Sequence, residues 1–180
     1  MQNTQKRDKR MGMTPEQFFE AFVLGNYEDY KQHPGCIRRA FNAAVSASHL
    51  GDHHFEYYKI RDSSKVNDFK SIGNYVEHLS KVTGGCFRDI RSIANAYKHL
   101  YTSRDPRNAV HSSISSTMAI ESICFAAEGS EVAQVQEDWI EDTKEGNFEL
   151  KVIFTKKDGQ QLDFLPTLES VIRYWEKELF

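Results

Sequence analysis

Long amphipathic segments in the first part of the chain most strongly limit how it can fold. Between residues 14 and 104, apolar side chains recur at the three- and four-residue spacing of one helix face. Interruptions at His33-Pro34-Gly35, Arg61-Asp62-Ser63-Ser64 and Thr83-Gly84-Gly85 divide this region. The pattern predicts four helices: one opened by Thr14-Pro15-Glu16-Gln17, a long one from about Cys36 to Ile60, one beginning near Val66, and one over residues 86–101.

The residue composition changes after Asn108, where Ser, Thr and β-branched residues become common. We expect a strand over residues 110–120. Phe148, Leu150, Val152 and Phe154 then alternate with polar residues, Asp158-Gly159 offers a turn, and Leu162 and Phe164 resume the alternation, which predicts a β-hairpin. A last apolar stripe at helical spacing follows Pro166.

These elements predict an α+β protein that is predominantly α. We expect a four-helix bundle, followed by a small antiparallel β-sheet or hairpin and a C-terminal helix. Residues 1–13 carry a basic run, and we expect them to form a flexible arm and residues 14–180 to form a single globular domain. Its parts are a helical bundle over 14–104, a β-rich segment over 109–165 and a helix over 166–180.

Composition excludes several classes of protein. No apolar run approaches the roughly 20 residues of a membrane-spanning helix, and the first residues lack the apolar stretch of a secretory signal. Cys36, Cys86 and Cys124 form no CxxC pair, so reduced thiols are the simplest interpretation. We therefore expect a cytoplasmic protein without membrane contact.

Charge is unevenly distributed along the sequence. Residues 1–108 contain 17 basic and 12 acidic side chains, whereas residues 109–180 contain 6 and 14. A basic first part attracts phosphate groups such as those of RNA or a nucleotide. Alternatively, the two parts pack on each other and their charges are complementary.

The predicted helix over residues 86–101 has two chemically different faces. At 100° per residue, one arc collects cations, an amide and an imidazole: Arg88, Arg91, Asn95, Lys98 and His99. A solvated helix face is also polar, but Glu and Gln usually fill it. Neighbours at i and i+4 on this arc could share one ligand oxygen or phosphate.

The long second helix carries a further polar strip of His49, Asp52, His53 and Glu56. His49 and His53 form an HxxxH pair, a weak candidate for a Zn²⁺ site that Asp52 or His99 would complete. The alternative is that Asp52 pairs with Arg91 or His99 and orients that side chain. Gly84-Gly85 precedes a helix start but lacks any phosphate-loop motif, so a turn is the better interpretation.

The segment with Arg91, Asn95, Lys98 and His99 resembles uncharacterised bacterial proteins that look related to the HEPN superfamily. The resemblance extends to His49 and Asp52 on the preceding long helix and to the aromatic pair Tyr174-Trp175. It implies a helical bundle that is often dimeric. It also implies a metal-independent ribonuclease of a toxin or defence system.

In that case, the ribose 2′-OH attacks the adjacent phosphate while His99 moves a proton and Arg91 holds the phosphate charge. Arg91, Asn95 and His99 are then the catalytic candidates, Arg88 and Lys98 bind substrate, and His49 and Asp52 support them. No cofactor is expected.

Three functions stay open from the sequence. The first is an RNA- or nucleotide-directed protein of HEPN type. The second is a non-catalytic interaction or assembly protein, with a partner protein or a second copy, in which the Arg, Asn, His and Asp side chains form a buried structural network. The third is a metal-dependent hydrolase that uses His49, Asp52 and His53.

Overall fold

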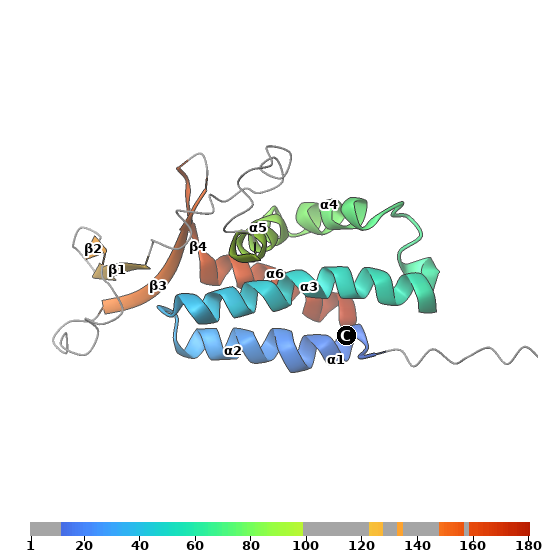
Figure 1. Cartoon of the computed structure of the whole chain (residues 1–180), viewed down its shortest axis with the longest axis horizontal. Coiled ribbons are helices and arrows are strands. Elements are labelled where there is room, and N and C mark those ends of the chain that lie inside the picture. Colours follow the sequence, from blue (N-terminus) through green and yellow to red (C-terminus); the bar gives the residue numbers. More distant parts are fainter. Residues whose placement is uncertain (1–11, 99–122, 128–132, 135–147, 157–158) are drawn as a thin grey trace, which may run out of the picture.

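The computed structural model describes residues 12–98, 123–127, 133–134, 148–156 and 159–180 (Figure 1). Several predictions fall outside this part of the chain. They concern most of the N-terminal arm, the end of the fourth helix from His99 onward, and the strand over residues 110–120.

The first helix runs from Pro15 to Gln32 and combines three segments. These are α1 (Pro15–Phe18), a π-helical segment (Phe19–Leu24) and α2 (Gly25–Gln32). Thr14 caps its start as predicted: the Thr14 side chain accepts a hydrogen bond from the Gln17 amide, and the Gln17 side chain accepts one from the Thr14 amide. The helix ends before Pro34, in agreement with the sequence.

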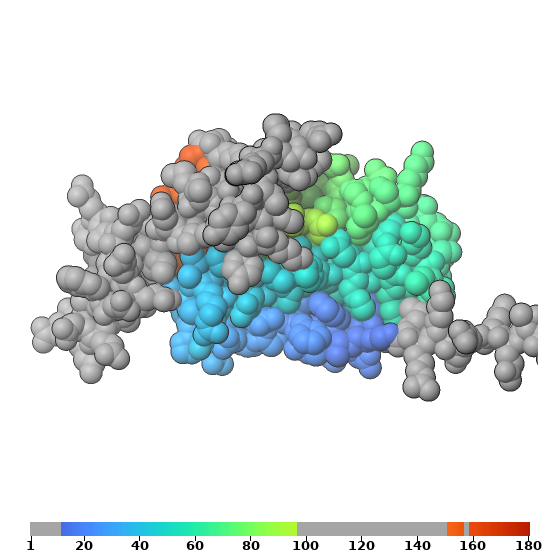
Figure 2. Space-filling model, in the orientation of Figure 1, coloured from blue at the N-terminus to red at the C-terminus, as the bar shows by residue number. Residues whose placement is uncertain are grey.

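The long helix α3 (Ile37–Arg61) lies beside α2 and packs against α5 and α6 as well. Figure 2 shows α1 and α2, α3 and α4 side by side on one face.

Small residues allow the close approach of neighbouring helices. At Gly51, a Cβ would lie 2.6 Å from Cζ of Phe87 on α5. The predicted bounds of α3 are confirmed to within one residue at each end, and its contacts with α2, α5 and α6 confirm its central position.

The third helix starts later than the sequence predicted. After a 3₁₀ turn (Ser63–Lys65), the chain continues without helix to Ser71, and α4 covers Ile72–Val82. The Ser71 side chain caps α4 by accepting from the Asn74 amide at 3.3 Å. Val66, which we expected inside the helix, is buried in the connecting loop. A buried loop residue thus continued the apolar spacing of the helix and led to a predicted start that is too early.

Helix α5 (Cys86–Lys98) begins after the turn at Gly84 and Gly85, both with positive φ. The Gly84 and Gly85 amides donate to the carbonyls of Lys81 and Ser80 and end α4. Phe87, Ile90 and Ala94 are buried on the apolar side of α5, as predicted. The turn therefore sets α4 and α5 next to each other.

The strands are β1 (Ile123–Ala127), β2 (Ala133–Gln134), β3 (Phe148–Thr155) and β4 (Gln161–Asp163), in the order β2-β1-β3-β4. All the pairings are antiparallel. The predicted hairpin is confirmed as β3 and β4, with Gly159 at φ 85° in its turn. Phe164, predicted to continue the strand, instead starts α6 (Phe164–Leu179). Its buried side chain suited both patterns.

Helix α6 and strand β3 complete the core of the helical part. The sheet lies at one end of the helices, and α6 runs back from it toward α1 (Figure 1), where Phe180 lies near Phe19. Buried side chains from α3, α5, β3 and α6 form one cluster that includes Leu50, Phe87, Phe154 and Trp175. The described part of the chain is therefore mostly helical with a small antiparallel sheet and a C-terminal helix, as predicted. Among the described residues, no helix is long and apolar enough to cross a membrane.

Candidate functional site

A cavity of about 620 Å³ lies between α4 and α5, and we call it the α4–α5 cavity. Three residues singled out in the sequence, Arg88, Arg91 and Asn95, line it. The remaining lining residues are Ile72, Gly73, Val76, Glu77 and Ser92. The structure therefore brings together three of the five polar side chains predicted on this helix face and places them in one concave surface.

The spacing along α5 explains this gathering. Residues 88, 91, 92 and 95 follow one another at i, i+3, i+4 and i+7, so their side chains form one strip along the helix. Phe87, Ile90 and Ala94 direct the other side of the helix into the core. Because that apolar side fixes how α5 rotates about its axis, the polar strip faces α4.

Arg91 forms an ion pair with Asp52 on α3. Its Nη1 atom lies 3.0 Å from Oδ1 and 3.1 Å from Oδ2 of the carboxylate. This contact confirms the predicted pairing of Asp52 with Arg91. The two side chains are 27% and 39% exposed, so this pair is half-buried. Arg91 thus connects α5 to α3 and also forms part of the cavity wall.

Arg88 forms a second ion pair across the cavity rim, with Glu77 on α4. Its Nη2 atom lies 3.3 Å from Oε1 of Glu77, and the two side chains are 57% and 76% exposed. An ion pair in such contact with water contributes little to stability, because solvent screens it and ordering two long side chains costs entropy. Glu77 was not identified from the sequence, since only the packing of α4 on α5 brings it here.

The other two residues predicted on this face are not placed by the structure. Lys98 is the last residue of α5, and the described side chains of this helix end before it. His99 lies outside the described residues. Their roles therefore remain predictions from the sequence.

Among the described residues, the candidate metal ligands His49, Asp52 and His53 do not form a site, and His99 lies outside this part of the chain. Nε2 of His53 lies 2.8 Å from the carbonyl oxygen of Met13, and its ring stacks on Phe18 with a centroid distance of 5.1 Å. His49 is half-buried on the same helix. Within the described part of the chain, which includes His49, Asp52 and His53, no three His, Cys, Asp or Glu side chains gather to hold a metal ion. The structure thus gives the metal-dependent hydrolase no support.

Helix α3 also carries a buried histidine, His54, that was not identified from the sequence. His54 is 3% exposed and is surrounded by the rings of Tyr58, Tyr75 and Trp175. Burial, together with the smaller effect of the nearby Lys65 ammonium, lowers the pKa of His54 to about 4. The signal was its spacing from Ala47 and Leu50, which places His54 on the apolar arc of α3.

Comparisons of this chain with models of known families, with curated proteins and with solved structures found no match. The relationship to the HEPN superfamily therefore rests on the sequence motifs alone and stays a prediction.

Proposed function

We propose that this protein binds RNA or a nucleotide in the α4–α5 cavity. One observation carries the proposal: Arg88, Arg91 and Asn95, chosen from the sequence as phosphate-binding candidates, line a single cavity. Guanidinium groups donate several hydrogen bonds in a fixed fork that suits phosphate oxygens. The Asn95 side-chain amide can donate and accept, as recognition of a sugar or base requires.

The two carboxylates next to these cations decide how a phosphate would enter. Asp52 holds Arg91 from the side of α3, and Glu77 holds Arg88 from the side of α4. Of the two pairs, Arg88–Glu77 is the longer and the more exposed. A phosphate would therefore separate Arg88 from Glu77 at a lower free-energy cost than Arg91 from Asp52. Asp52 meanwhile keeps Arg91 oriented toward the cavity.

The resemblance to the HEPN superfamily extends this proposal to catalysis. In a metal-independent ribonuclease of a toxin or defence system, His99 would move the proton of the attacking 2′-OH and Arg91 would stabilise the charge on the phosphate. Lys98 would position the RNA backbone. The proposal includes the HEPN type of four-helix bundle and its association as a homodimer.

Binding can be measured with fluorescently labelled single-stranded RNA. We expect Arg88→Ala and Asn95→Ala each to weaken binding by about fivefold to tenfold, because each removes one contact of about 1–1.4 kcal/mol. Arg173→Ala, which removes an exposed cation from α6, is the matched control. Equal affinity in the native protein and both cavity variants would reject this site, as would an equal loss in the control.

Cleavage needs a separate experiment. We expect His99→Ala to bind RNA as the native protein does and to lose cleavage, and chelation of divalent metals to leave cleavage unchanged. Cleavage that persists in His99→Ala, or that a chelator abolishes, would contradict the metal-independent mechanism.

The ion pair of Arg91 with Asp52 favours a second candidate, a non-catalytic assembly protein in which this pair only joins α5 to α3. A double-mutant cycle with Arg91→Met and Asp52→Asn measures the coupling energy by thermal or urea unfolding. Because both side chains are part-exposed, we expect about 1 kcal/mol of coupling. In this second case, Arg88→Ala and Asn95→Ala change neither stability nor RNA affinity.

A further inference from the structure

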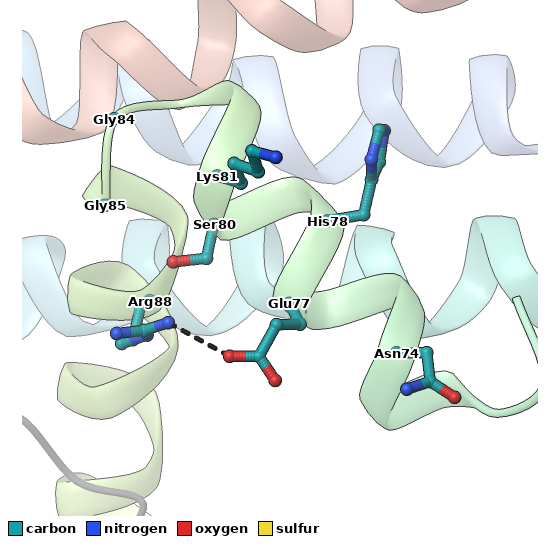
Figure 3. Close-up of a pocket in the computed structure, with 8 residues that line it drawn as sticks. All are labelled: Asn74, Glu77, His78, Ser80, Lys81, Gly84, Gly85 and Arg88. Carbon is teal, nitrogen blue, oxygen red and sulfur yellow. Dashed lines mark hydrogen bonds and ion pairs between the residues drawn. The ribbon is translucent and has the colours of Figure 1, made fainter.

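A second cavity adjoins the first at the turn between α4 and α5. It also measures about 620 Å³, and we call it the turn cavity. Figure 3 shows its lining residues, which are Asn74, Glu77, His78, Ser80, Lys81, Gly84, Gly85 and Arg88. None of these residues except Arg88 belongs to the site predicted from the sequence.

The two cavities share the residues Glu77 and Arg88. These two side chains meet across the gap between α4 and α5 at 3.3 Å (Figure 3), so their ion pair is the partition between the cavities. Because both side chains extend into solvent, either can swing away without uncovering buried surface. Separation of this pair would join the two cavities into one groove along α4 and α5.

The lining of the combined groove favours an anionic ligand. Three basic side chains line it, those of Lys81, Arg88 and Arg91, whereas Glu77 is its only lining carboxylate among the described residues. The His78 imidazole and the Asn74 amide add further hydrogen-bond donors. A ligand with phosphates at regular intervals matches this distribution, because one cavity holds Arg91 and the other holds Lys81.

The turn at Gly84 and Gly85 gives a ligand room to approach but offers it no free backbone N–H groups from these two residues. Nothing lies within 4 Å of where a Cβ would stand on Gly84 or Gly85, so a ligand can approach the backbone there. The amides of both glycines already donate to carbonyls of α4. The cationic side chains must therefore hold a phosphate in the turn cavity.

We propose that the α4–α5 cavity and the turn cavity together bind single-stranded RNA across at least two consecutive phosphates. Arg88 leaves Glu77 and binds the phosphate at the junction, Lys81 and His78 bind the next phosphate, and Glu77 competes with RNA for Arg88. This inference rests on the proposed function and specifies its ligand as an oligonucleotide.

The test compares two probes, adenosine monophosphate and a 2′-O-methylated RNA tetranucleotide that cannot be cleaved through its 2′-OH. We expect Lys81→Ala to weaken tetranucleotide binding about threefold to tenfold, because it removes one phosphate contact, and to leave binding of the monophosphate unchanged. Lys177→Ala, an exposed cation on α6, should change neither. Glu77→Gln should tighten tetranucleotide binding, because it removes the competing charge.

The outcomes separate this inference from the proposed function. If the monophosphate binds through Arg88 and Asn95 but Lys81→Ala and Glu77→Gln leave the tetranucleotide affinity unchanged, the groove is wrong and the first cavity stands. If Lys81→Ala weakens both probes equally, the turn cavity is not a separate subsite. If the native protein binds neither probe, both proposals fail.

Discussion

The hydroxyl of Tyr75 lies 2.9 Å from Nδ1 of His54, and the two rings stack with an interplanar angle of 10°. Burial raises the pKa of the Tyr75 hydroxyl, so Tyr75 keeps its proton. The hydroxyl donates to Nδ1 or accepts from it, according to the tautomer of the neutral imidazole. This hydrogen bond joins α3 to α4 in the core, where burial of the imidazole requires an uncharged His54.

The first prediction follows from this requirement and concerns stability against pH. The pKa of His54 is about 4 in the folded protein and 6.5 for an unperturbed histidine, the value used for the unfolded chain. As the pH falls, the unfolded chain therefore binds the extra proton first. Stability is fully present above pH 6.5 and is lost as the pH falls toward 4. The shift corresponds to roughly 3 kcal/mol.

Urea unfolding at a series of pH values measures this loss. His54→Phe should flatten the profile between pH 6.5 and 4, because it removes the titrating group from the core. His33→Ala, at an exposed position, is the control and should keep the native profile. A native protein whose unfolding free energy did not fall across this window would contradict the buried neutral histidine.

The second prediction concerns the close contact of α3 with α5. At Gly51, a Cβ would meet Phe87 at 2.6 Å and Leu79 at 3.1 Å, so Gly51→Ala must displace the Phe87 ring and the Leu79 side chain and should cost about 1–3 kcal/mol. Gly25→Ala on α2 is the matched control, with nothing within 4 Å of the new Cβ. It should stabilise the helix by up to about 1 kcal/mol. Thermal unfolding that showed the same sign for both variants would argue against this packing.

The third prediction concerns the ion pair of Lys156 with Asp89, which joins the end of β3 to α5. The two atoms lie 3.0 Å apart, and the side chains are only 19% and 12% exposed. Lys156→Met should therefore destabilise the protein by about 2–3 kcal/mol, since it leaves a poorly hydrated carboxylate without this cation. Lys151→Met breaks the more exposed pair with Asp163 and should cost about 1 kcal/mol or less. Equal losses in urea unfolding would contradict the assigned burial.

The fourth prediction concerns the start of α4. Ser71→Ala removes the side chain that accepts from the Asn74 amide and should cost about 1 kcal/mol. Ser63→Ala, in the exposed 3₁₀ turn, should cost less than half of that. Circular dichroism during thermal unfolding can measure both. If the two variants lost the same stability, the helix would start elsewhere.

Local sequence signals predicted the elements whose ends are encoded within a few residues. The capping box at Thr14, the stop before Pro34 and the turn at Gly159 each act through neighbouring atoms, and each was read correctly. The start of α4 was misread because Val66 and Phe69 continued the apolar spacing, although Ser71 and Asn74 carried a capping signal. Periodicity reports burial, and a buried loop residue satisfies it as well as a helical one does.

The candidate site shows the same division. Arg88, Arg91 and Asn95 belong to one helix, so their alignment followed from a 100° rotation per residue. Glu77 and the turn cavity depend on how α4 packs against α5, which no local pattern encodes. The burial of His54 depends on Tyr75 and Trp175, which lie far along the chain, so no neighbouring residue signals it.

The position of Trp175 in the centre of the core has a consequence for how this protein is made. During translation, α3 and α5 leave the ribosome before α6 is synthesised, so the apolar surfaces around Leu50 and Phe87 have no cover at that stage. The packed core around Trp175 can therefore form only after α6 has been synthesised.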